Sequence, residues 1–145
     1  MIREIGVFGT NENVLKVLVC ITAQSNSKRL IDMAASKADE LNAELHILNV
    51  QKGTSIFNDK DMPARIQELF SYGTEKGGMI HAYCDEDIPG IIGSFIEREK
   101  ITHIILGSPP NNLNNHKKEE NQFNNIVSKI PKNVKVIIFE RNGEI

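Results

Sequence analysis

The sequence contains no tryptophan and few other aromatic residues, six phenylalanines and two tyrosines among 145 residues. Cysteine is equally scarce: Cys20 and Cys84 lie far apart, each within an apolar stretch. Two distant cysteines exclude a disulfide framework and a paired-cysteine metal motif. Because unpaired cysteines are usually buried, we expect two buried free thiols.

An excess of positive charge and a long hydrophobic run are also missing. The formal net charge is -2 and the sequence pI is about 6.1, which gives polyanions no long-range attraction. No apolar run is as long as a signal peptide or a membrane span. We therefore expect a cytoplasmic protein that binds neither nucleic acid nor membrane.

What the chain does contain is the composition of a soluble globular protein, with 40% hydrophobic and 25% charged residues. A chain of 145 residues is long enough for one hydrophobic core. We expect a lead-in segment over residues 1–15 and a single domain over residues 16–145.

Short apolar runs rich in β-branched residues predict five strands. They lie at residues 16–22, 44–50, 79–84, 103–107 and 134–139. Apolar residues at helical spacing predict four helices between them. The stripes span residues 30–41, 62–70, 88–96 and 123–130, and glycines at 73, 77 and 78 interrupt the second helix. The acidic residues 85–87 are expected to start the third helix.

Regular alternation of strand and helix predicts right-handed crossovers and a mainly parallel sheet. The expected architecture is an α/β fold, a three-layer doubly wound sandwich with helices on both faces of a five-stranded sheet. The last strand is apolar and is expected at an edge of the sheet, where it could pair with another chain.

In open parallel sheets, ligands bind beyond the carboxyl ends of the strands, so residues at or just after the strand ends are the candidates for a binding site. They are Thr22, Ala23, Ser25, Ser27, Val50, Leu106, Gly107 and Ser108. Serines near a helix start either cap the helix or bind an anion. A glycine at a strand exit either allows a close approach to a ligand or simply makes the turn.

Signs of catalysis and of metal binding are absent. No nucleophile elbow, full phosphate-binding Walker pattern or zinc signature occurs, and no histidine has metal-type spacing to another ligand. His46 and His103 are expected to be hydrogen-bonded residues within strands. We expect no catalytic residue, no metal and no enzymatic activity.

Several segments together resemble the universal stress protein family. Residues 18–21, 25–31 and 43–46 carry the likeness, and residues 85–88 and 101–107 extend it. More narrowly, the chain is similar to the universal-stress-like domain of potassium-sensing histidine kinases. The resemblance implies an adenine nucleotide alpha hydrolase-like fold and a regulatory role in stress signalling. It also implies a homodimer formed through the last strand, with a signalling protein as a further partner.

The resemblance further implies an adenine nucleotide as ligand, ATP or AMP, or a cyclic dinucleotide. Val50 would then lie against the base, and Gly107 with Ser108 against the phosphates. Thr22 and Ala23 would border the ribose. Ser25 and Ser27 would bind a phosphate or a ribose hydroxyl.

One family motif is altered. The nucleotide-binding branch carries a glycine, two residues, a second glycine, nine residues, a third glycine and then serine or threonine. Here Gly107 matches, but Pro110, Glu120 and Asn121 stand at the later positions. Proline lacks an N–H and a carboxylate repels phosphate, so the usual phosphate cradle is degenerate. The alternative function is a dimeric interaction module that binds no nucleotide.

Overall fold

Five strands alternate with four helices in the computed structural model, which describes residues 14–21, 27–52, 62–108 and 116–139. None of the helices in these ranges is long and apolar enough to cross a membrane. In chain order the elements are β1 (Lys16–Cys20), α1 (Ser27–Leu41), β2 (Glu44–Gln51), α2 (Met62–Glu75), β3 (Met79–Cys84), α3 (Ile88–Glu99), β4 (His103–Gly107), α4 (His116–Ser128) and β5 (Lys135–Phe139).

The strands form one sheet in the order β3-β2-β1-β4-β5, and every neighbouring pair is parallel. The expected sheet was mainly parallel, and no described strand runs the other way. The central position of β1 explains its apolar sequence. Val17, Leu18 and Val19 are all 0% exposed because helices cover both faces of the sheet.

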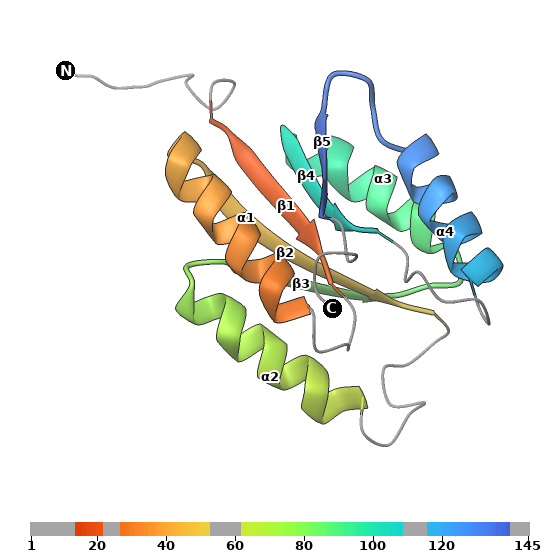
Figure 1. Cartoon of the computed structure of the whole chain (residues 1–145), viewed down its shortest axis with the longest axis horizontal. Helices are drawn as coiled ribbons and strands as arrows, with labels where there is room; N and C mark the ends of the chain where they lie inside the picture. Colours follow the sequence, from red (N-terminus) through yellow and green to blue (C-terminus); the bar gives the residue numbers. More distant parts are fainter. Residues whose placement is uncertain (1–13, 22–26, 53–61, 109–115, 140–145) are drawn as a thin grey trace.

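Helices lie on both sides of this sheet (Figure 1). The apolar stripes of α1 and α2 pack into one hydrophobic cluster, which contains Ile31, Ala34 and Leu69. Those of α3 and α4 pack into a second cluster on the opposite face, which contains Phe95 and Ile126. The predicted three-layer, doubly wound α/β sandwich is therefore confirmed.

Several element boundaries differ from the expectation, among them those of β1 and α4. β1 ends at Cys20, although the N–H of Ile21 still donates to the carbonyl of Leu48 at 2.9 Å. α4 already begins at His116, ahead of the apolar stripe predicted over residues 123–130, and it ends at Ser128. Polar residues hid the first turns because they carry no apolar stripe.

Glycine at position 73 does not interrupt α2, which continues to Glu75. A Cβ at Gly73 would overlap Cδ1 of Ile47, a side chain that is 0% exposed. The missing side chain lets α2 approach β2 closely. The chain turns after the helix, where Gly77 has a φ of 89°.

The acidic residues before α3 cap the helix, as expected from the sequence. A carboxylate oxygen of Asp87 accepts the N–H of Gly90 at 3.1 Å, and Asp85 accepts the N–H of Asp87 at 2.8 Å. Side-chain acceptors of this kind satisfy the free N–H groups of a first turn. These carboxylates therefore have a structural role.

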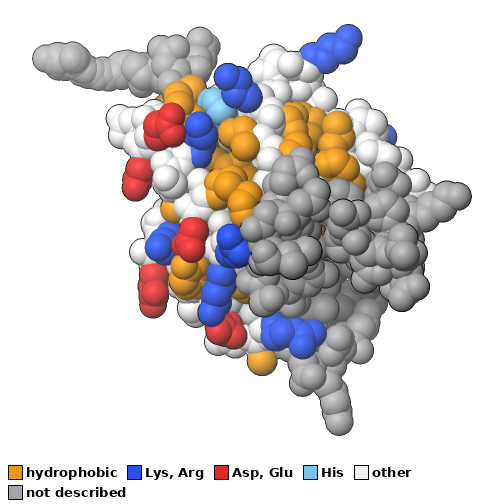
Figure 2. Space-filling view, viewed as in Figure 1, with side chains coloured by type: hydrophobic (Ala, Val, Ile, Leu, Met, Phe, Trp, Pro, Cys, Tyr) orange, Lys and Arg blue, Asp and Glu red, His pale blue; other side chains and the backbone are white. Residues whose placement is uncertain are grey.

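The two outer strands differ in their exposed side chains. β5 lies at one edge, as predicted, and its Val136 and Ile138 are 37% and 36% exposed. Hydrophobic side chains gather in the region where Figure 1 shows β5 (Figure 2). At the other edge, β3 carries one large exposed apolar residue, Met79, which is 44% exposed.

Candidate functional site

The order of the strands reverses between β1 and β4, which are neighbours in the middle of the sheet. α1 follows β1 onto one face, and α4 follows β4 onto the other. α1 and α4 therefore diverge to opposite faces of the sheet, and in open parallel sheets ligands bind beyond the carboxyl ends of the strands at such a point. The predicted site residues that the structure describes, Ser27, Val50 and residues 106–108, lie at or near this edge.

The first predicted segment is described only at its end. Thr22, Ala23 and Ser25 lie outside the described residues. Ser27 is the first residue of α1 and is 1% exposed. Because this hydroxyl is buried and has a partner, its burial favours a structural role at the helix start.

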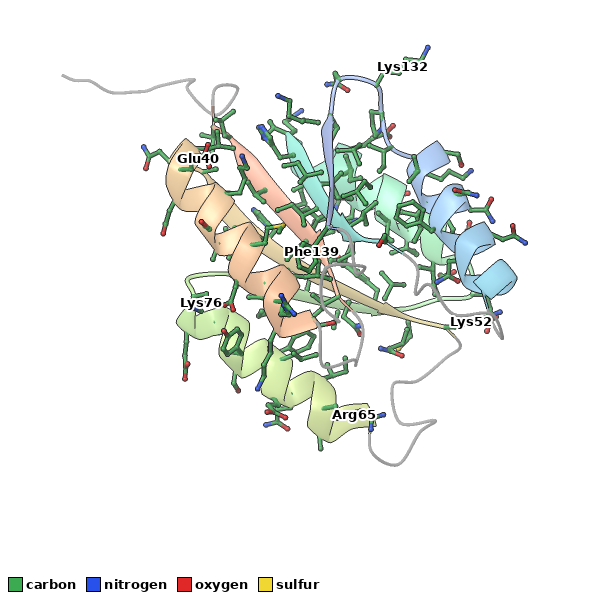
Figure 3. The ribbon with its side chains drawn as sticks, in the orientation of Figure 1. Glu40, Lys52, Arg65, Lys76, Lys132 and Phe139 are labelled. Atoms are coloured by element: carbon green, nitrogen blue, oxygen red, sulfur yellow. The ribbon has the colours of Figure 1, made fainter. Side chains whose placement is uncertain are left out.

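Val50 lies near the carboxyl end of β2, opposite Tyr83 of the edge strand β3. It is partly buried and packs, like Cys20 of β1, against the hydrophobic cluster beneath α3 and α4. Lys52 follows the strand, is exposed, and lies at the far end of β2 in Figure 3. This end of the sheet thus offers an apolar wall with a cation beside it.

The third predicted segment, residues 106–108, lies at the end of β4 and contacts both α1 and β5. Leu106 is 4% exposed and belongs to the core. A Cβ at Gly107 would lie 3.2 Å from Cδ1 of Leu30, so the glycine also makes room for α1. The N–H of Ser108 donates to the carbonyl of Phe139 at 2.9 Å, and its side chain is partly exposed. Ser108 is therefore the residue of this segment best placed to contact a ligand.

Sequence reasoning missed a buried amide at the same edge. Asn49 is 0% exposed, and its Nδ2 donates to the carbonyl of Ile21 at 2.8 Å. Its Oδ1 accepts from Nε2 of Gln51 at 2.9 Å. The amide therefore fixes the chain where it leaves β1. An asparagine between the apolar residues Leu48 and Val50 of a buried strand was the signal, because a buried polar group needs partners.

A cationic group near the carboxyl edge was also missed. The guanidinium carbon of Arg29, in the first turns of α1, lies 5.9 Å from the ring centroid of Phe139. Figure 3 shows Phe139 at the end of β5, near the start of α1. The ring holds the cation where α1 and β5 meet.

The Cys20 thiol at this edge has low reactivity. Burial raises the pKa of the Cys20 thiol to about 12, so the thiolate is not available as a nucleophile. Both cysteines are free, as expected, but they are partly rather than fully buried. Among the described residues, no group of three or more histidine, cysteine or acidic side chains could hold a metal ion.

A cleft of about 450 Å³ lies at the other end of the sheet, lined in part by Val14, Ile101 and Pro131. These residues flank the amino ends of β1, β4 and β5. The cleft is therefore separate from the predicted site at the carboxyl ends.

Comparison with known proteins places the fold. No family model and no curated protein sequence matches the chain. Solved structures do match: a universal stress protein in complex with cAMP is 17% identical over 86% of this chain and 94% of its own, with a TM-score of 0.62. An Archaeoglobus fulgidus universal stress protein in complex with dAMP is 16% identical, with 86% and 96% coverage and a TM-score of 0.62.

A third similar structure is the universal stress protein UspA from Lactobacillus plantarum. It is 14% identical, covers 86% of this chain and 97% of its own, and has a TM-score of 0.60. Such identities establish a common fold and no more. This chain has the fold of the universal stress proteins, the adenine nucleotide alpha hydrolase-like fold.

Proposed function

We propose that this chain is a regulatory protein of the universal stress type that binds an adenine nucleotide at the carboxyl edge of its sheet. The observation that carries the proposal is the divergence of α1 and α4 beyond β1 and β4. Solved structures of the same fold contain cAMP or dAMP. The narrower likeness to the domain of potassium-sensing kinases remains part of this proposal.

The base and the phosphates of a nucleotide each have a matching group among the described residues of this edge. Val50 offers an apolar surface for the base, and Cys20 packs against the same hydrophobic cluster. Ser108 offers a partly exposed hydroxyl at the end of β4, and Arg29 adds a nearby positive charge. Thr22, Ala23 and the other predicted loop residues lie outside the described ranges.

The altered phosphate motif makes the expected contacts unusual. Pro110 and the side chain of Glu120 lie outside the described residues, whereas Asn121 is an exposed residue of α4. Because Pro110 has no backbone N–H and Glu120 brings a carboxylate, the segment offers phosphates one donor fewer and an added negative charge. We therefore expect weak binding, and AMP or a cyclic nucleotide should compete well with ATP.

Replacing Ser108 by aspartate tests the position of the phosphates. A carboxylate there would repel a bound phosphate. Calorimetry should show that the affinity for AMP falls at least about tenfold, which is a loss of roughly 1.4 kcal/mol of binding free energy. The matched control is Ser94→Asp, the same change at an exposed position of α3. Equal affinities for the two variants would refute binding at the end of β4, and no heat with any nucleotide would refute the function itself.

We also propose that the protein is a homodimer that pairs through β5. Its exposed apolar residues, Val136 and Ile138, lie on the edge strand. Ile138→Lys should shift the protein from dimer to monomer in sedimentation experiments, because a charge on an edge strand opposes pairing. Met79→Lys makes a similar change at the opposite edge and should leave the dimer intact. A monomeric wild type, or the reverse effect of the two variants, would contradict this arrangement.

Binding rather than turnover is the proposed activity, with a signalling protein as partner. The raised pKa of Cys20 removes one nucleophile from the edge. The competing function is a nucleotide-independent dimeric interaction module, which the exposed residues of β5 also favour. A dimer that binds no nucleotide would select this alternative.

A further inference from the structure

Two histidines far apart in sequence meet on neighbouring strands. Nδ1 of His46 in β2 lies 3.1 Å from Nε2 of His81 in β3, within hydrogen-bond distance. The two rings are nearly parallel, with an interplanar angle of 16° and centroids 5.2 Å apart. His46 is 3% exposed and His81 is partly buried. We call these two residues the histidine pair.

The surroundings of the pair determine where its protons lie. Nε2 of His46 lies 3.1 Å from Oε1 of Glu44, and because a carboxylate oxygen accepts hydrogen bonds, this nitrogen is the one that donates. In a neutral His46 ring, Nδ1 is then an acceptor, and Nε2–H of His81 must donate to it. Both rings can be neutral with every facing nitrogen satisfied.

Adding protons has different effects at the first and second step. A first proton can bind the remaining nitrogen, Nδ1 of His81, without disturbing the hydrogen bond to His46. A second proton can bind only Nδ1 of His46, which would place two N–H groups and two positive charges face to face at 3.1 Å. The hydrogen bond survives zero or one added proton and is lost with two.

Charged and aromatic groups from the neighbouring elements α3 and β1, and from β3 itself, lie around the pair. Phe95 of α3 packs edge-on against His81, with ring centroids 4.6 Å apart. On the same helix, Glu99 favours a charged His81 whereas Arg98 opposes it, and Arg98 also donates to the Tyr83 hydroxyl of β3 at 2.7 Å. On the other side, Nζ of Lys16 in β1 lies 4.0 Å from Oε1 of Glu44.

We propose that the histidine pair is a proton-sensing link that ties the edge strand β3 to β2 and opens when both rings are charged. Burial lowers the pKa of His81, and the charge of His46 lowers it further. A folded pKa below the unfolded value of about 6.5 means stability is present above that pH and is lost as the pH falls. The equilibrium constant for unfolding should then rise about tenfold for each unit by which the pH falls. This holds over the range in which the folded pair binds one proton fewer than the same two residues do in the unfolded chain.

Nitrogen-detected NMR titration of the imidazole rings tests the coupling. In the wild type, we expect the pair to titrate in two steps separated by more than about one pH unit. His81→Gln, which cannot be protonated, should shift the titration midpoint of His46, whereas His103→Gln should leave the pair unchanged. His103 is a matched control because it is also a strand histidine with a lowered pKa, caused by burial and nearby lysines.

Amide hydrogen exchange tests whether β3 opens away from β2 when both rings are charged. During the second titration step, protection of β3 amides should fall relative to those of β5 in the wild type, but not in His81→Gln. If that variant is poorly folded, His81→Asn replaces it. Independent titration of His46 and His81, or equal loss of protection in both edge strands, would overturn the proposal. Neither measurement involves a nucleotide, so the result is independent of the proposed function.

Discussion

Asn49→Asp should reduce the free energy of unfolding by about 3–5 kcal/mol at neutral pH, the usual cost of an uncompensated buried charge. The substitution keeps the shape of the side chain but replaces the Nδ2 donor with oxygen. That oxygen would then face the carbonyl oxygen of Ile21 at about the present 2.8 Å. Because Asn49 is 0% exposed, water cannot screen the repulsion.

The pH dependence identifies the cause. A buried carboxyl group can donate to the Ile21 carbonyl only when protonated, so its folded pKa should lie above the ordinary value of about 3.9. The stability of Asn49→Asp relative to wild type should then fall as the pH rises above that value, by up to about 1.4 kcal/mol per pH unit. Denaturant titrations between mildly acidic and neutral pH measure this slope.

Gln51→Glu is the matched control for this change. It makes the same amide-to-acid replacement two residues later, but Gln51 is only partly buried and loses a single contact, with Asn49. We expect a loss of about 1 kcal/mol or less. A similarly small loss for Asn49→Asp, or one that does not depend on pH, would mean that the amide does not anchor the exit of β1.

Phe95→Ala should also cost about 3–5 kcal/mol, because it deletes a large buried ring and leaves a cavity. Phe95 is 1% exposed and contacts three aromatic or histidine rings from two strands. Its loss would expose one side of the histidine pair as well as the core beneath α3. Chemical denaturation measures the change in free energy.

Phe139→Ala provides the comparison for Phe95→Ala. Phe139 is only partly buried, at the end of the edge strand, so the same deletion should leave a smaller cavity and cost clearly less. Equal losses for the two variants would show that the second hydrophobic cluster is not the tightly packed core described above.

The fold could be predicted because the local patterns agree with one another. Val17, Leu18 and Val19 form a continuous apolar run, which is typical of a strand covered by helices on both faces. The amphipathic stripes predict the helices that provide this cover. Boundaries were less predictable where no stripe marks them, as at the start of α4. Gly73 was misjudged because sequence shows a flexible residue and not the close approach of Ile47.

The site could be predicted only in part, because its contacts join distant residues. The general rule for parallel sheets led to Val50 and Ser108, both at the expected edge. Asn49 and Ile21 are 28 positions apart, and His46 and His81 are 35 apart. Such pairs depend on strand order and register, which a single sequence does not specify.

The most direct test of the account is to map the nucleotide site on isotope-labelled protein by following its amide signals during titration with AMP. The account predicts that signals of Ile21, Val50 and Ser108, at the carboxyl edge, shift together and saturate. Signals of Ile101 and Val134, beside the cleft at the opposite end of the sheet, should not move. Saturable shifts confined to that cleft, or no shifts with any adenine nucleotide, would contradict it.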